Sequence, residues 1–125
     1  MLSSLLATTN LPKEIETIIG SEKYQQLIEL LASYRVGMWL YPGVIKRKIG
    51  LSTQKTYEIL QSMENAGSLE SYYELYCSSC QKTSGIVVRT FNELPETFEC
   101  ELCFSVLPSI ENAFLIYKVI DVGMH

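Results

Sequence analysis

Residues 77–80 read Cys-Ser-Ser-Cys, and residues 100–103 read Cys-Glu-Leu-Cys. These two motifs contain all 4 cysteines of the 125-residue chain, and 19 residues lie between them. Two C-x-x-C motifs at this spacing are typical of a four-cysteine metal site, because each pair of thiolates can hold one side of a tetrahedral ion. The sequence therefore predicts a structural Zn²⁺ ion with no coordination position open to substrate or water. The predicted ligands are Cys77, Cys80, Cys100 and Cys103.

Two other uses of the cysteines stay open at this stage. They could form two disulfides in a secreted protein, or two redox-active dithiols. However, the N-terminal residues MLSSLLATTNLP lack the basic region and the long apolar run of a signal peptide. The chain also has no apolar window long enough for a transmembrane helix. We therefore expect a cytoplasmic protein without membrane contact, and a reducing compartment favours zinc over disulfides.

Length and composition predict a small globular protein. Hydrophobic residues make up 47% of the chain and charged residues 19%, which suits one domain or two small units that share a core. The formal net charge is −4. Four thiolates and one Zn²⁺ would bring it to about −6, whereas nucleic-acid-binding domains are usually basic.

The N-terminal half carries the signals of helices. Residues 1–20 predict a polar lead-in with a short helix, and residues 21–34 predict a longer helix with one apolar stripe. Residues 43–49 and 53–66 predict two more helices, the second of them capped by Ser52 and ended by a glycine. A short helix, a tight turn and a capped second helix are typical of a helix-turn-helix.

Strand-like runs complete the pattern at residues 38–41, 69–76 and 113–120. The cysteine motifs lie between the last two runs, and residues 85–91 predict a further strand between the motifs. The sequence therefore predicts an α+β fold, a winged helix-turn-helix whose wing is extended into a four-cysteine zinc ribbon. The predicted parts are the lead-in (1–20), the winged-helix domain (21–76 and 111–125) and the zinc ribbon (77–110).

From Gly37 to Cys103 the chain resembles proteins that combine a winged helix with a zinc ribbon. Such proteins include the transcription factor E type and small adaptor proteins of bacterial operons. The stretches that carry the resemblance are GMWLYPGVIKRKIGLSTQKTYEILQSMENAG (37–67) and the two cysteine motifs. The resemblance is one of architecture, and it implies a non-enzymatic binding module with DNA or a protein as partner. It places Lys55, Tyr57 and Gln61 on a recognition helix, and Lys46, Arg47 and Lys48 on the helix before it.

The charge pattern favours DNA binding and transcription regulation as the leading prediction. From Arg35 to Tyr57 the chain has five basic residues and no acidic one, so this stretch could face DNA phosphates. The basic triplet 46–48 could equally be an ordinary solvated turn of helix. Glutamates crowd the ribbon, and the alternative function is therefore a protein-protein adaptor that docks through this acidic surface. Its candidate anchors are Phe91, Phe98 and Phe104.

The sequence offers little for catalysis. The single histidine, His125, is the last residue, and Asp121 is the only aspartate. No histidine stands near the cysteine motifs to activate a serine, and no glycine-rich phosphate loop occurs. We therefore expect no enzyme and no small-molecule substrate, with a dithiol oxidoreductase as the remaining enzymatic alternative.

Overall fold

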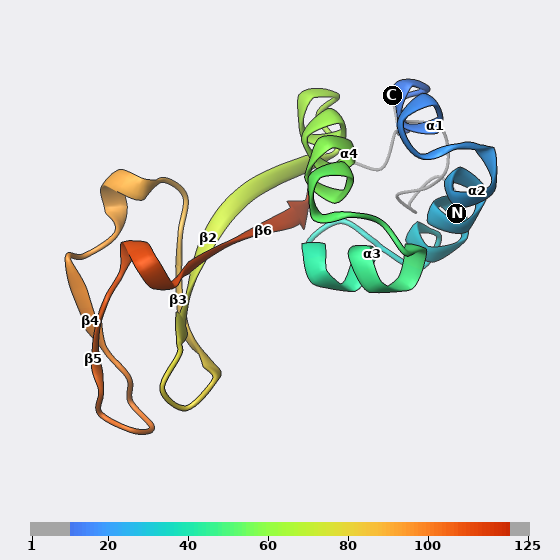
Figure 1. Cartoon of the computed structure of the whole chain (residues 1–125). Coiled ribbons are helices and arrows are strands. Elements are labelled where there is room, and N and C mark those ends of the chain that lie inside the picture. The colour runs from blue at the N-terminus through green and yellow to red at the C-terminus, as the bar shows by residue number, and fades with distance from the viewer. Residues whose placement is uncertain (1–10, 121–125) are drawn as a thin grey trace. The chain divides into compact units, whose positions relative to one another are not determined.

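The computed structural model describes residues 11–120 and is a mixed α+β protein with an antiparallel sheet (Figure 1). This confirms the α+β class predicted from the sequence. The chain divides into two compact units. We call residues 11–70 and 117–120 the helical unit, and residues 71–116 the cysteine unit.

The order of the elements is as follows. The helical unit begins with α1 (Glu14–Ile19), α2 (Ser21–Leu31), β1 (Trp39–Leu40), α3 (Pro42–Ile49) and α4 (Thr53–Asn65). The chain continues with β2 (Leu69–Cys77), β3 (Lys82–Val88), the 3-10 helix η2 (Phe91–Glu93), β4 (Thr97–Glu99), β5 (Val106–Pro108), the 3-10 helix η3 (Ile110–Asn112) and β6 (Ala113–Val119).

Local signals set the limits of α3 and α4. Pro42 occupies the first turn of α3, where its missing N–H is not needed. Gly50 ends this helix in the left-handed conformation, with φ 79°, and its N–H donates to the carbonyl of Lys46. Two residues further on, the Ser52 hydroxyl accepts a hydrogen bond from the Lys55 N–H at 3.1 Å and caps α4. The helices predicted at residues 43–49 and 53–66 are therefore α3 and α4, and their ends lie within a residue of the predicted ones.

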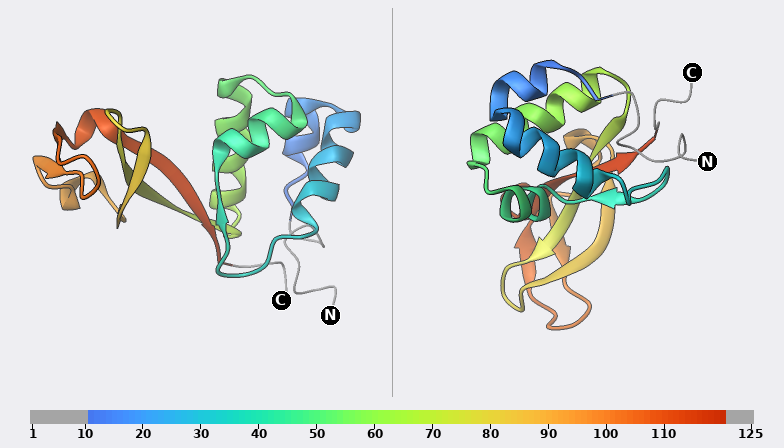
Figure 2. Two further views of the ribbon diagram at one scale, coloured as in Figure 1. Left: turned by 90° about the horizontal axis from the view of Figure 1, so that it is seen from below. Right: turned by 90° about the vertical axis from the view of Figure 1, so that its right-hand side faces the viewer.

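The helices of this unit bury their apolar faces against one another. Figure 2, which gives two further views, shows α1 to α4, coloured blue to green, packed together. α1 packs against α2 and α4, so the predicted lead-in contributes Ile15 and Ile19 to the core. α2 ends at Leu31 and not at Tyr34, because residues 32–34 form a turn closed by the Tyr34 N–H on the Leu31 carbonyl. Within residues 11–120, no helix is both long and apolar enough to cross a membrane.

The larger sheet has the strand order β1-β6-β2-β3. β1 pairs with β6 in antiparallel register, with Trp39 opposite Lys118 and Leu40 opposite Tyr117. The chain leaves the helical unit along β2 and returns to it along β6. The cysteine unit is therefore one continuous segment that includes most of β2 and the first half of β6, and residues 78–112 lie between these two neighbouring strands.

The cysteine unit contains two hairpins. β2 pairs with β3, and β4 pairs with β5, which places Phe98 opposite Leu107. The strand predicted at residues 85–91 lies instead at Lys82–Val88. The reason is a capping box, in which the Thr90 side chain and the Glu93 carboxylate each bond the other residue's backbone and turn the chain into η2.

Candidate metal centre

The four cysteines lie in two equivalent turns of the cysteine unit. Residues 77–80 follow β2 into the first turn, and residues 100–103 follow β4 into the second. Each turn is closed by the residue after its second cysteine, Gln81 or Phe104, whose N–H donates to the carbonyl of the first cysteine at 2.7 and 2.8 Å. Both closing residues have left-handed backbone conformations, with φ 62° and 63°. The same local geometry thus presents two sulfur atoms from each side.

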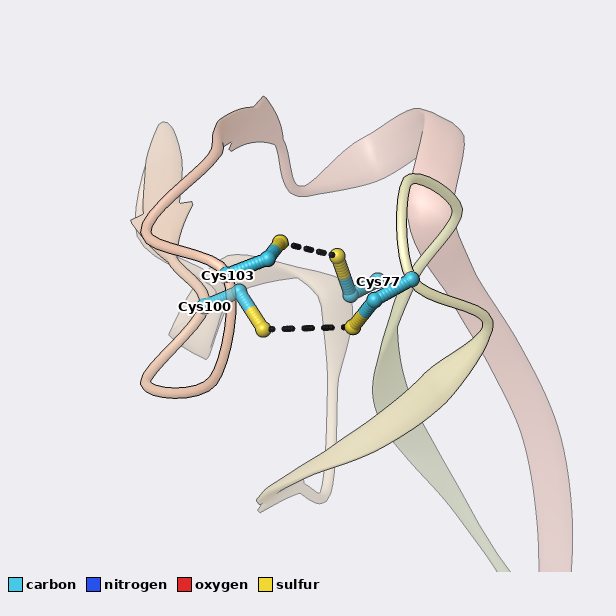
Figure 3. Close-up of side chains that lie close together, drawn as sticks. Cys77, Cys100 and Cys103 are labelled. Carbon is cyan, nitrogen blue, oxygen red and sulfur yellow. Dashed lines mark hydrogen bonds between the residues drawn. The ribbon is translucent and has the colours of Figure 1, made fainter.

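The sulfur atoms of all four cysteines lie within 4.8 Å of one another. The Sγ atoms of Cys77 and Cys103 are 3.5 Å apart, and those of Cys80 and Cys100 are 3.6 Å apart. Figure 3 shows the side chains of Cys77, Cys100 and Cys103 pointing toward a common centre. A tetrahedral ion with metal–sulfur bonds of about 2.3 Å would require sulfur–sulfur distances of about 3.8 Å. The four side chains could therefore hold one metal ion.

The same distances bear on the two alternatives for the cysteines. All four are free, and contacts of 3.5 and 3.6 Å are far longer than a disulfide bond of about 2.0 Å. Each of these contacts joins one motif to the other. A redox dithiol, in contrast, uses the two sulfurs of a single C-x-x-C motif. The arrangement is the one expected of a shared ligand set.

Hydrogen bonds at the second turn favour the thiolate form that binds metals. Backbone N–H groups of Cys103 and Leu102 lower the pKa of the Cys100 thiol, and the Leu102 nitrogen lies 3.4 Å from its sulfur. The hydroxyl and the N–H of Ser105 lower the pKa of Cys103 to about 6. Burial and the three neighbouring sulfurs raise the pKa of Cys80 to about 12. A cation at the centre would remove this last effect, because it stabilises every thiolate around it.

The left-handed backbone at Gln81 gives a direct test of this turn. We expect Gln81→Gly to bind Zn²⁺ as tightly as the wild type, because glycine adopts this conformation without strain. Gln81→Val should bind roughly tenfold more weakly, because a β-branched residue is strongly disfavoured at positive φ. Competition with a chromophoric chelator measures both affinities. Ser79→Val, at an exposed position of the same turn, is the control, and an equal loss in both valine variants would contradict the explanation.

The basic residues predicted to contact DNA lie around the turn between α3 and α4. Lys46, Arg47 and Lys48 are exposed in the last turn of α3, and Lys55 is exposed in the first turn of α4. The structure adds Lys23 from α2, whose Nζ donates to the carbonyls of residues 49 and 50 at 3.0 Å each. Lys23 and Lys55 line a hollow of about 180 Å³ beside this turn. Sequence reasoning missed Lys23, because nothing local connects it with a turn 26 positions away.

Tyr57 and Gln61 lie elsewhere on α4. Successive residues of a helix are about 100° apart, so Lys55 and Tyr57 point about 160° apart around the axis. Tyr57 and Gln61 line a groove of about 540 Å³ between α1 and α4, together with the carboxylates of Glu14 and Glu58. The Ser62 hydroxyl donates a hydrogen bond to the Glu14 carboxylate, and the Gln54 amide donates one to the Glu58 carboxylate at 3.2 Å. The predicted DNA-contacting residues thus fall into a basic set and a set that faces two acids.

Comparisons of the chain with family models, with curated proteins and with solved structures found no match. The class of the molecule is therefore defined by its own architecture. It is an α+β protein in which a helical unit carries an inserted unit with a four-cysteine cluster suited to a metal ion.

Proposed function

We propose that this protein is a zinc-stabilised winged-helix module that binds duplex DNA and acts in transcription regulation without catalysing a reaction. The order of its elements supports the winged helix. A helix, a short strand, a helix-turn-helix and a strand follow one another as α2, β1, α3, α4 and β2, and the second long strand, β6, comes after residues 78–112. The last strand of this series, β6, lies between β1 and β2 in the sheet, so that β2 and β6 form the wing.

Zinc is the metal that this donor set fits best. Tetrahedral sites made of four sulfurs select zinc or iron–sulfur clusters, and two C-x-x-C turns around a single centre are typical of zinc ribbons. Four protein ligands fill the coordination sphere, so the ion's role in the proposal is structural. We place the protein in the cytoplasm, where a reducing environment keeps the four cysteines available to the metal.

The proposal of DNA binding is carried by the cluster of basic side chains at the turn between α3 and α4. The helical unit as a whole has eight basic and seven acidic residues, so its net charge is only +1. Its cations are therefore concentrated locally, which is what a phosphate-binding surface requires. The cluster consists of Lys23, Lys46, Arg47, Lys48 and Lys55. It surrounds the turn on more than one side, because Lys46 and Lys48 are two positions apart on α3 and point about 160° apart around its axis.

The geometry favours contacts with the DNA backbone over contacts with base edges. Tyr57 and Gln61, the residues best suited to reading bases, share their groove with Glu14 and Glu58. These carboxylates would repel the phosphates on either side of a DNA groove. Phosphate contacts position a protein on DNA but carry no sequence information. We therefore propose a modest affinity with little sequence preference for the isolated chain.

A salt titration tests this proposal. If Lys46, Arg47, Lys48 and Lys55 all meet phosphates, the slope of log K against log salt should be about −3.6. Binding to a fluorescent duplex should then weaken roughly 150-fold between ~50 and ~200 mM salt, as measured by fluorescence anisotropy. A duplex of scrambled sequence and equal length should bind within a few-fold. Absence of binding at ~50 mM salt would overturn the DNA proposal.

The alternative function is a protein-protein adaptor, and one observation favours it. The cysteine unit has six acidic and two basic residues, a net charge of −4, and it also exposes large apolar side chains. Of the three predicted anchors, Phe98 is only 5% exposed and belongs to the core. Phe91 and Phe104 are 51% and 69% exposed, so they remain available to a partner.

A further inference from the structure

An apolar hollow of about 330 Å³ opens on the cysteine unit. We propose that it receives one large apolar side chain of a protein partner, from a segment in which lysine or arginine residues flank that side chain. The volume lies within the range of small-molecule pockets and suffices for a single aromatic or branched side chain. The residues that line the hollow are Phe91, Leu94, Pro95, Glu96, Pro108 and Ile110.

The walls of this hollow are held in place by contacts of their own. The ring of Phe91 stacks on Tyr73 with a centroid distance of 4.2 Å and an angle of 25°. The capping box of η2 fixes the backbone on which Phe91 stands. On the opposite wall, the Asn112 amide donates to the Pro108 carbonyl at 2.7 Å, and the Ser109 N–H donates to the Glu96 carbonyl at 3.1 Å. A preformed site of this kind loses little conformational entropy when it is filled.

The chemistry of the lining selects an apolar occupant. Pro95 and Pro108 have no backbone N–H, so this part of the wall offers few hydrogen-bond donors. Ile110 is 71% exposed, and covering it would remove a large apolar area from water.

The charge around the hollow selects a basic protein segment. Glu96 lines the hollow, Glu93 lies in the adjoining η2, and Glu111 lies in the adjoining η3. The unit carries −4 before any metal is bound, and four thiolates with one Zn²⁺ would add about −2. DNA would be repelled by this surface, whereas lysine and arginine beside an apolar anchor would be attracted. The inference rests on the adaptor alternative and deepens it, and it does not depend on the DNA proposal, because it uses the other unit.

A short synthetic peptide, Lys-Lys-Gly-Trp-Gly-Lys-Lys, serves as the probe. We expect it to shift the NMR signals of residues 91–96 and 108–110 in the isotope-labelled, zinc-loaded full chain, with saturation on titration. Replacing tryptophan by alanine should weaken binding roughly tenfold, because the apolar anchor is lost. Replacing the four lysines by glutamates should abolish it. Shifts that are absent, or that map to another part of the chain, would overturn the proposal.

A matched pair of variants locates the site on the protein. Ile110→Asp should reduce peptide affinity at least tenfold, since it removes an apolar side chain from the lining and the tryptophan would have to desolvate a carboxylate, a cost that outweighs the added attraction to lysine. Val106→Asp changes a residue of the same unit that is 65% exposed and does not line the hollow, so its affinity should stay at the wild-type value. Equal losses in the two variants would contradict the assignment, provided that both retain their zinc.

Two further readouts separate this inference from other outcomes. The affinity of Ile110→Asp for DNA should equal that of the wild type. A failure of the DNA proposal therefore leaves the peptide result valid, and a failure of peptide binding leaves the DNA proposal valid. If the hollow instead receives a second copy of this chain, analytical ultracentrifugation should show a dimer that Ile110→Asp dissociates. That result would replace the basic partner by self-association.

Discussion

The Cys77→Ser variant is expected to lose its metal ion and, with the ion, the ordered structure of the cysteine unit. Cys77 is buried and supplies one of the four sulfurs, and a serine hydroxyl is a poor replacement for a thiolate. A structural Zn²⁺ ion contributes on the order of 10–16 kcal/mol to the folding of small domains. The apolar core of this unit cannot compensate. Its buried apolar residues are Leu75, Cys77, Phe98, Cys100 and Ile116, and two of these are cysteines of the cluster itself.

Elemental analysis and NMR spectra of the purified variant would measure this effect. The far-UV circular dichroism of the helices should largely persist, because the helical unit has its own core of residues such as Leu27, Ile59 and Met63. Ser78→Ala, at an exposed position of the same turn, is the control and should keep one ion per chain. Treatment of the wild type with a strong chelator should reproduce the spectrum of Cys77→Ser. A variant that keeps both its metal and its melting temperature would refute the structural role of the cluster.

The second large effect is expected for the triple variant Lys46→Glu, Arg47→Glu, Lys48→Glu. It should bind duplex DNA on the order of 1,000-fold more weakly than the wild type at ~50 mM salt, because three phosphate contacts become three repulsions. All three side chains are exposed, so the core should be unaffected. The exchange does remove favourable charges from the C-terminus of α3, which costs about 0.3–1 kcal/mol for each residue.

Anisotropy titrations with the same duplex would measure the loss. The control is the double variant Lys13→Glu, Lys82→Glu, which reverses charges outside the turn between α3 and α4 and should bind nearly as the wild type does. Equal losses per reversed charge, three in the test variant and two in the control, would mean that net charge, and not this surface, governs binding. Tyr57→Ala should change affinity less than twofold, because its side chain lies in the groove with Glu14 and Glu58.

The features that could be predicted from the sequence are those set by neighbouring residues. Pro42, Gly50 and Ser52 act within one helical turn, so they placed α3 and α4 correctly. The cysteine motifs likewise predicted the cluster, since their spacing alone implies two turns that meet. The error in the strand at 85–91 came from the pair Thr90 and Glu93, whose capping box outweighed the β-propensity of the run.

Features that depend on tertiary packing were beyond the sequence. Lys23 joins the basic cluster only because α2 brings it to the end of α3. α1 similarly places Glu14 beside Tyr57, which changes the surroundings of a predicted DNA-contacting residue. The hollow on the cysteine unit combines residues in and after η2 with Pro108 and the first residue of η3, and no local pattern connects the two segments.

The segment between β2 and β6, residues 78–112, has a consequence for how such a protein can change over time. The two strands are neighbours in the sheet, so the inserted segment starts and finishes at adjacent points of its host. A segment of this kind can be lengthened, shortened or replaced by a simple turn while β2 and β6 stay paired. A change of partner in the helical half therefore need not alter the half that carries the four cysteines.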